Sequence, residues 1–424
     1  MSRSLNIRNV RISDPQSPFH AQICDIRVEA GAITHISASL SEPADEEIDG
    51  SGAWVSPGWV DAYSRIPDPG EPWKESLASA CEAAQQGGFT HLFALCGTHP
   101  SADLPETLES VGQRSRALLC QVHPLGMVSE KGQGKELSEL HMLSQAGAVA
   151  FTDGIVASPK LSQRLKTMQY AHSLGLSLWS HPCMAGWLGE AKMHEGTVNA
   201  SLGLKGIPSM AEFVELQADL ELVRYTGASL RILGVSCRES VELIRQAKAE
   251  GLPIWASVPV MNLAENDTAM SGFDENFKVL PPLRSEDDRL ALWEGLQDGT
   301  LDAVISNHHP EDAETSLVEF DYSPFGAATL PLVWSLLSRS NPGMDADALV
   351  SRLHRGARTF CGLPSLVLAP GAPADLTLFQ VSGETAIRLH EHGSTAVNMP
   401  YAGQVLPGQV LGTLCNGTWK GGLR

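Results

Sequence analysis

The chain contains 424 residues, of which 43% are hydrophobic and 19% are charged, and its formal net charge at pH 7 is −19. A chain of this length is too long for one small domain and fits a large domain with an accessory one. The negative charge argues against nucleic acid or an anionic membrane as the main partner, because both need a basic surface.

Cysteine usage and hydropathy narrow the class of protein further. The N-terminus MSRSLNIRNVRI has no apolar signal core, and no stretch approaches the ~18 uninterrupted apolar residues that suggest a membrane span. The eight cysteines form no CxxC pair, and several lie in apolar runs, such as Cys96 and Cys120. We therefore expect reduced, buried cysteines in a cytoplasmic protein without a membrane segment.

The first predicted elements are short strands within residues 4–50. Segments such as LNIRNVRI and QICDIRVEAGAITHI are typical of strands, and the EAG before AITHI suits a hairpin turn.

The middle of the chain alternates between short apolar runs and helix-like segments. The apolar runs cover residues 58–63, 90–96, 117–123, 148–153, 176–181, 230–236, 253–259 and 302–308. Helical patterns such as 238–251 and 287–299 end in glycine, as helices often do. Continuous apolar strands that alternate with helices indicate parallel strands covered on both faces. Eight such units predict a (β/α)8 TIM barrel over residues 56–365.

The C-terminal segment, residues 366–424, again shows a strand pattern, for example in PADLTLFQV. Two strand-rich ends around one barrel predict a single small β-sandwich domain built from residues 1–55 and 366–424.

In a (β/α)8 barrel the active site lies at the carboxyl ends of the strands, so chemistry is sought there. The predicted strand ends carry Tyr63, Arg65, Gly97, His123, Asp153, His181, Gly234, Pro259, Asn307 and His308.

Several long segments follow one another in the order of a known family. They include SGAWVSPGWVDAY (51–63), GGFTHLFALCGTHP (87–100), GAVAFTDG (147–154) and the long run KVLPPLRSEDDRLALWEGLQDGTLDAVISNHHP (278–310). In this order they resemble the amidohydrolase superfamily and, within it, the long-chain dihydroorotases and their allantoinase and hydantoinase relatives. The resemblance spans nearly the whole chain and implies a barrel with a flanking β-sandwich.

The resemblance implies one or two zinc ions held by histidines and carboxylates at six strand-end positions. Those positions carry Tyr63 and Arg65 in place of a His-x-His pair, Asp153 and His181 as in the family, Gly234 in place of a histidine, and Asn307 in place of an aspartate. The guanidinium of Arg65 has no lone pair for a metal, and Gly234 has no side chain. Asn307 cannot take a proton from water, so the general base is missing too.

The residues that would recognise a substrate are also changed. The family arginine that binds the dihydroorotate carboxylate corresponds to Pro67, and its asparagine partner corresponds to Gly97. Arginine suits a carboxylate because it forms two parallel hydrogen bonds, which proline cannot do.

The resemblance and these losses together predict a dihydroorotase-like protein of pyrimidine biosynthesis that is catalytically inactive. Its vestigial pocket would comprise Tyr63, Arg65, Asp153, His181, Asn307 and His308. No catalytic residue, metal or other cofactor is expected. Some members of the family that lack the ligands are partners of aspartate carbamoyltransferase, so the resemblance implies this enzyme as a partner, together with a homodimer. No nucleic acid or membrane partner is expected.

Two other functions stay open at this point. One is an active cyclic-amide hydrolase with a rearranged mononuclear zinc site formed by Asp153, His181 and His308, whose ligand types suit zinc. The other is a metal-free binding protein whose barrel mouth is lined by Tyr63, Arg65 and Trp179. If the protein holds no metal, whether as the inactive dihydroorotase-like protein or as the binding protein, Arg65 is a candidate to pair with Asp153 and replace the charge of the metal.

Overall fold

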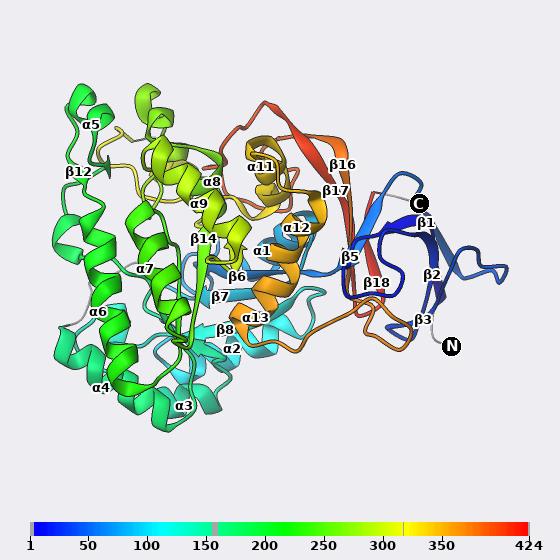
Figure 1. Ribbon diagram of the computed structural model, residues 1–424, viewed down its shortest axis with the longest axis horizontal. Coiled ribbons are helices and arrows are strands. Elements are labelled where there is room, and N and C mark those ends of the chain that lie inside the picture. The colour runs from blue at the N-terminus through cyan, green and yellow to red at the C-terminus, as the bar shows by residue number, and fades with distance from the viewer. Residues whose placement is uncertain (1–3, 155–159, 317, 423–424) are drawn as a thin grey trace.

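A computed structural model describes residues 4–154, 160–316 and 318–422, and it contains two eight-stranded sheets joined through one chain. One sheet is surrounded by helices, and the other lies beside it and carries both chain termini (Figure 1). The predicted (β/α)8 barrel with a second β domain from the two chain ends is confirmed.

The barrel is a parallel sheet with the strand order β6-β7-β8-β9-β10-β13-β14-β15. Its strands are β6 (Trp59–Ile66), β7 (Phe89–Cys96), β8 (Gln121–Gly126), β9 (Ala150–Phe151), β10 (Leu178–Ser180), β13 (Leu230–Ile232), β14 (Ile254–Pro259) and β15 (Ala303–Ile305). The ring closes beyond β15, where Ser64 and His308 form a parallel bridge. The backbone N–H of Arg65 donates to the carbonyl oxygen of His308 at 2.9 Å, so the last strand end is fixed to the first.

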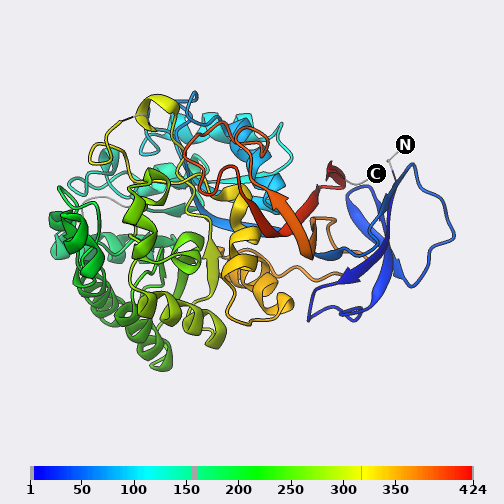
Figure 2. The same cartoon turned by 90° about the horizontal axis from the view of Figure 1, so that it is seen from above.

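The helices lie outside the barrel (Figures 1 and 2). They are α1 (Leu77–Gln86), α2 (Pro105–Ser115), α3 (Leu140–Gln145), α4 (Leu161–Ser173), α5 (Thr197–Leu202), α6 (Met210–Thr226), α7 (Arg238–Ala249), α8 (Val260–Ala264), α9 (Glu286–Asp298), α10 (Ala313–Ser316), α11 (Val333–Ser340), α12 (Ala346–Ser351) and α13 (Ala357–Cys361). Helix α9 shows why the sequence begins and ends a helix here. Ser285 and Asp288 form a reciprocal capping box, and Gly299 ends the helix at φ +86°.

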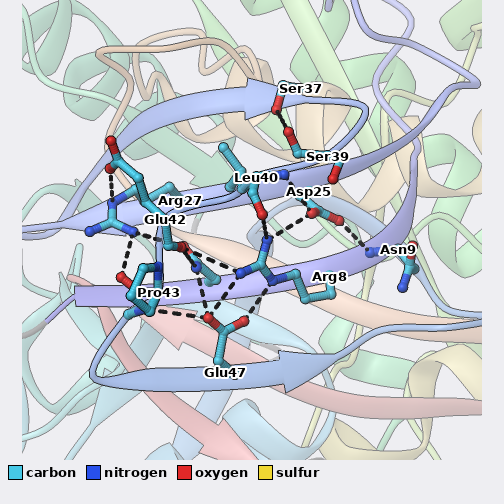
Figure 3. A network of polar contacts seen from close by, with 12 residues as sticks. Arg8, Asn9, Asp25, Arg27, Ser37, Ser39, Leu40, Glu42, Pro43 and Glu47 are labelled. Atoms are coloured by element: carbon cyan, nitrogen blue, oxygen red, sulfur yellow. Dashed lines mark hydrogen bonds and ion pairs between the residues drawn. The ribbon is translucent and has the colours of Figure 1, made fainter.

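The second sheet has the order β18-β17-β16-β5-β1-β2-β3, with β4 paired to β1. Its strands are β1 (Ser4–Ile12), β2 (Ile23–Glu29), β3 (Ala32–Ser37), β4 (Glu46–Asp49), β5 (Trp54–Pro57), β16 (Leu376–Ala386), β17 (Val405–Cys415) and β18 (Thr418–Gly421). Strands β5 and β16 pair antiparallel and so join the two chain ends. A polar network around Arg8 ties β1 to its neighbours, because the guanidinium donates to Glu47 at 2.6 Å and to Asp25 at 2.9 Å (Figure 3).

An aromatic cluster joins the two sheets. Trp59 of β6, Trp334 of α11 and Phe379 of β16 lie with ring centroids 4.8–5.4 Å apart. Such tilted and edge-on pairs add to the stabilisation from burial. Within the described residues, no helix has the length and apolar character needed to cross a membrane.

The third barrel strand differs from its prediction. The apolar run 117–123 predicts a strand end at His123, but β8 covers Gln121–Gly126. Proline commonly ends a strand because it has no N–H donor, yet the carbonyl oxygen of Pro124 accepts a hydrogen bond from the N–H of Val149 at 3.0 Å. His123 therefore lies within the strand, where its ring stacks on Phe93 at a centroid distance of 4.4 Å.

Candidate functional site

Two small cavities lie at the carboxyl ends of the barrel strands. The Arg65 cavity has a volume of about 70 Å³ and is lined by Tyr63, Arg65, Val279, Leu280, Asn307, His308, His309, Phe325, Gly326 and Ala327. The His181 cavity has a volume of about 100 Å³ and is lined by Val128, Thr152, Asp153, Gly154, Arg164, Thr167, Met168, Leu178, Trp179, Ser180, His181, Asp219 and Leu230. The six predicted pocket residues are therefore divided between two cavities. Trp179, predicted to share a pocket with Tyr63 and Arg65, lines the other cavity.

Tyr63 fills the space between the two cavities. Its side chain is buried, and its hydroxyl lies so close to Gly154 that a Cβ there would be 2.6 Å from the oxygen. Burial raises the pKa of the Tyr63 phenol, so the group stays protonated and can donate a hydrogen bond. Gly154 has φ +68°, a left-handed conformation that glycine adopts without steric cost.

Arg65 is held by its backbone and not by its side chain. Its N–H donates to the carbonyl oxygen of His308, and the residue is partly buried. Among the residues that the structure describes, no hydrogen bond or ion pair reaches the guanidinium. A cation in a partly dehydrated cavity without a counter-charge costs free energy.

Asp153 is engaged by Ser129 and not by Arg65. Its carboxylate accepts the N–H of Ser129 at 2.8 Å and the hydroxyl of the same residue at 2.7 Å. Burial raises the pKa of Asp153, and these hydrogen bonds act in the opposite direction. The suggested Arg65–Asp153 pair is therefore wrong, because the serine in the loop after β8 occupies both carboxylate oxygens.

His181 occupies the place where a side chain of residue 234 would project. A Cβ on Gly234 would lie 2.7 Å from Nε2 of His181, and Gly234 has φ +67°. Both ring nitrogens of His181 are buried without a hydrogen-bond partner in the described structure. Burial lowers the pKa of the imidazole to about 3, so the ring is neutral at pH 7. A histidine at position 234 would therefore compete with His181 for the same space.

Asn307 and His308 are each committed to structural contacts. Asn307 has φ +52°, and its amide donates to the carbonyl oxygen of Leu280 at 2.8 Å. His308 is fully buried, and its Nδ1 accepts the N–H of Leu330 at 3.3 Å. Its Nε2 lies 3.8 Å from Glu75, a carboxylate that is also fully buried.

The strand ends do not fit the zinc centre that the family pattern implies. Four of the six positions present a phenol, a guanidinium, an amide and no side chain, while Asp153 is bonded to Ser129. Over residues 4–154, 160–316 and 318–422, no group of three or more His, Cys, Asp or Glu side chains could hold a metal ion. Catalytic zinc needs three protein ligands. Asp153, His181 and His308, which the rearranged site requires, are not brought together as such a group.

Sequence reasoning missed two residues that shape this region. Ser129 fixes Asp153, and Glu75 lies beside His308 and accepts a hydrogen bond from the hydroxyl of Ser394. Neither residue belongs to a motif with a fixed spacing. Ser129 and Glu75 lie in loops whose paths depend on the whole barrel, so no local pattern could have identified them.

Known proteins are similar to this chain over nearly its whole length. The family model described as Dihydro-orotase-like matches residues 52–264. The chain is 36% identical to a dihydroorotase of Anaeromyxobacter sp. (strain K), with 98% of each chain covered. It is 34% identical to a dihydroorotase of Pelotomaculum thermopropionicum, with 93% of each covered. Among solved structures, the L-hydantoinase (dihydropyrimidinase) from Arthrobacter aurescens is similar in fold, with a TM-score of 0.86, 21% identity, and 100% of this chain and 97% of that chain covered.

Proposed function

The chain belongs to the dihydroorotase-like family of the amidohydrolase superfamily, and on that premise we propose that it serves pyrimidine biosynthesis without hydrolase activity of its own. The observation that carries this proposal is the donor set at the strand ends. The six positions that match the family's metal ligands keep only Asp153 and His181, which line one cavity, and Asp153 is already bonded to Ser129. With too few ligands for zinc, the usual route to an activated water at neutral pH is lost.

The scaffold around the lost site supports a structural role. Long family segments are present in order, and the barrel closes through bonds between β6 and the segment after β15. If natural selection acts on the surface and the stability of the protein and not on catalysis, the family segments and the closed barrel are retained while the pocket residues change. We propose that its partner is aspartate carbamoyltransferase, as the resemblance to ligand-depleted family members implies, and that the chain forms a homodimer.

A reducing compartment is part of the same proposal. All eight cysteines are free, and most are buried. Free cysteines are usual where thiols are kept reduced, which supports the cytoplasm as the place of action.

Co-purification tests the partnership. The full chain, tagged and isolated from the cells that make it natively, should bring down aspartate carbamoyltransferase in a fixed ratio. The expressed tag alone is the control. Removal of the gene should reduce the assembled carbamoyltransferase in size-exclusion chromatography. A complex of unchanged size and amount without this chain would contradict the partnership.

A hydrolysis assay tests the absence of activity. The zinc-supplied protein should not interconvert dihydroorotate and carbamoyl aspartate above the rate of a heat-denatured control. The matched variant His181→Phe removes one of the two retained ligands and should leave this background unchanged. Turnover that His181→Phe abolishes would overturn the proposal and support the rearranged mononuclear hydrolase instead.

A further inference from the structure

The Arg65 cavity contains a guanidinium without a counter-charge. The structure describes many other arginines with carboxylate or carbonyl partners; Arg8, for example, donates to Glu47, Asp25 and the carbonyl of Leu40 (Figure 3). The side chain of Arg65 has no such partner among the described residues, although the residue is partly buried. Because an unpaired charge loses solvation when buried, such a site gains free energy from a bound anion.

Tyr63 is a second lining residue that can donate a hydrogen bond. It is 4% exposed, and its hydroxyl, which lies against Gly154, has no hydrogen-bond partner among the described residues. Burial raises the pKa of the phenol while the nearby charge of Arg65 lowers it, so the hydroxyl keeps its proton close to the guanidinium-bearing residue.

The lining of the cavity excludes competing acidic groups. None of its ten lining residues is Asp or Glu, in a chain with a net charge of −19. Two acids lie just outside the lining, each 3.8 Å from a ring nitrogen: Glu311 from Nε2 of His309, and the buried Glu75 from Nε2 of His308. Lys74 pairs with Glu311 at 2.8 Å, and the hydroxyl of Ser394 donates to Glu75. Neither carboxylate forms an ion pair with Arg65 in the described structure.

The size of the cavity limits the ligand. Its volume of about 70 Å³ exceeds the 10–15 Å³ or so that one water needs, and it leaves room for a group of a few heavy atoms. Guanidinium groups bind planar carboxylates and phosphates through paired hydrogen bonds.

We propose that the Arg65 cavity is a binding site for a small oxyanion, a carboxylate or a phosphate group, held by the guanidinium of Arg65 and the hydroxyl of Tyr63. The anion then sits where the family pattern places metal ligands. This inference rests on the proposed loss of the metal centre, but it does not depend on the partnership with aspartate carbamoyltransferase.

Isothermal titration of the purified full chain tests the site. Inorganic phosphate and acetate are titrated separately at constant ionic strength, and the arm with the higher affinity identifies phosphate or carboxylate as the group. We expect one anion per chain in at least one arm. Arg65→Gln should weaken binding about tenfold or more, because hydrogen bonds to charged groups are lost. Arg65→Lys should retain part of the affinity, and Tyr63→Phe should weaken it less than Arg65→Gln.

Arg11→Gln is the matched control, since Arg11 stacks over Trp54 at 4.6 Å in the second sheet, away from the cavity. This variant should bind as the unaltered chain does. If Arg65→Gln fails to fold by circular dichroism, Arg65→Lys and Tyr63→Phe decide the question. Absence of binding in both arms, or equal affinity in the Arg65 and Arg11 variants, would overturn the proposal. Zinc content and hydrolysis, measured on the same samples, show separately whether the proposed function itself has failed.

Discussion

Two arginines near the carboxyl ends of the strands show how differently polar groups are held there. Arg284, in the loop before α9, is 3% exposed, and its guanidinium donates to Ser236 at 2.7 Å and to Glu212 at 3.3 Å. Glu212 in turn accepts the N–H of Ser236 at 2.9 Å. Arg65, at the end of β6, has no side-chain partner in the described structure. The loop network around Arg284 pairs its cation with a carboxylate, whereas the guanidinium of Arg65 has no counter-charge among the described residues.

Two histidines repeat the contrast. Burial lowers the pKa of His354 to about 4 and that of His181 to about 3. The Nε2 atom of His354 lies 3.0 Å from the carbonyl oxygen of Leu366, within hydrogen-bond distance, while neither nitrogen of His181 has a partner in the described chain. His354 is thus bonded to the scaffold, whereas His181 lies unsatisfied at a strand end where the family pattern places a metal ligand.

The largest expected effect is at Arg284. Arg284→Met should lower the free energy of unfolding by about 3–5 kcal/mol, because it leaves the buried carboxylate of Glu212 without its cation. Urea denaturation measures the loss. Arg65→Met is the matched variant and should change stability by less than about 1 kcal/mol, since no protein partner is lost. Equal losses in the free energy of unfolding for the two variants would show that the side chain of Arg65 is as well paired as that of Arg284.

A smaller loss should follow from a side chain at position 234. Gly234→Ala combines a left-handed backbone with a Cβ 2.7 Å from Nε2 of His181, and it should cost about 1–3 kcal/mol. Gly175→Ala is the control, because Gly175 has the same φ of +67° with nothing near its Cβ position. If thermal unfolding shows the same cost for both, His181 does not occupy the space as described. The double variant with His181→Ala should recover part of the difference.

Replacing each histidine by phenylalanine should give unequal results. His354→Phe loses a buried hydrogen bond and should cost about 1–3 kcal/mol. His181→Phe removes two unpartnered nitrogens and should be neutral or stabilising by up to about 1 kcal/mol at pH 7. Guanidinium denaturation measures the change in the free energy of unfolding for each of the two variants. A larger cost for His181→Phe than for His354→Phe would show that His181 has a partner after all.

The last effect is on the acid side of the stability curve. Burial lowers the pKa of His181 from 6.5 to about 3 in the folded chain. Between these pH values, the imidazole is protonated in the unfolded chain and neutral in the folded chain. The stability from this group is therefore present above pH 6.5 and is lost progressively as pH falls toward 3. Unfolding followed from pH 7 to pH 4 should show a shallower loss for His181→Phe than for the unaltered chain. Parallel curves would contradict the lowered pKa.

The fold could be predicted from the sequence because its signals are local and repeated. Apolar runs such as 90–96 and 253–259 fall on strands, and the strand-rich ends form the second sheet. The end of β8 could not be predicted, because the strand continues through Pro124. For the site, the sequence predicted which strand-end residues belong to it but not how their side chains contact one another. Its division into two cavities depends on how Ser129, Gly154 and Gly234 pack against Asp153, Tyr63 and His181, and such packing leaves no pattern along the chain.

The central claim is that this barrel has lost its metal centre, and metal content tests it most directly. The protein should be purified without chelators from cells grown with added zinc, and its metals measured by mass spectrometry. Because a catalytic site needs three ligands, we predict fewer than about 0.1 zinc ions per chain. One or more tightly held zinc ions per chain would show that other side chains have replaced the lost ligands, and would contradict the account.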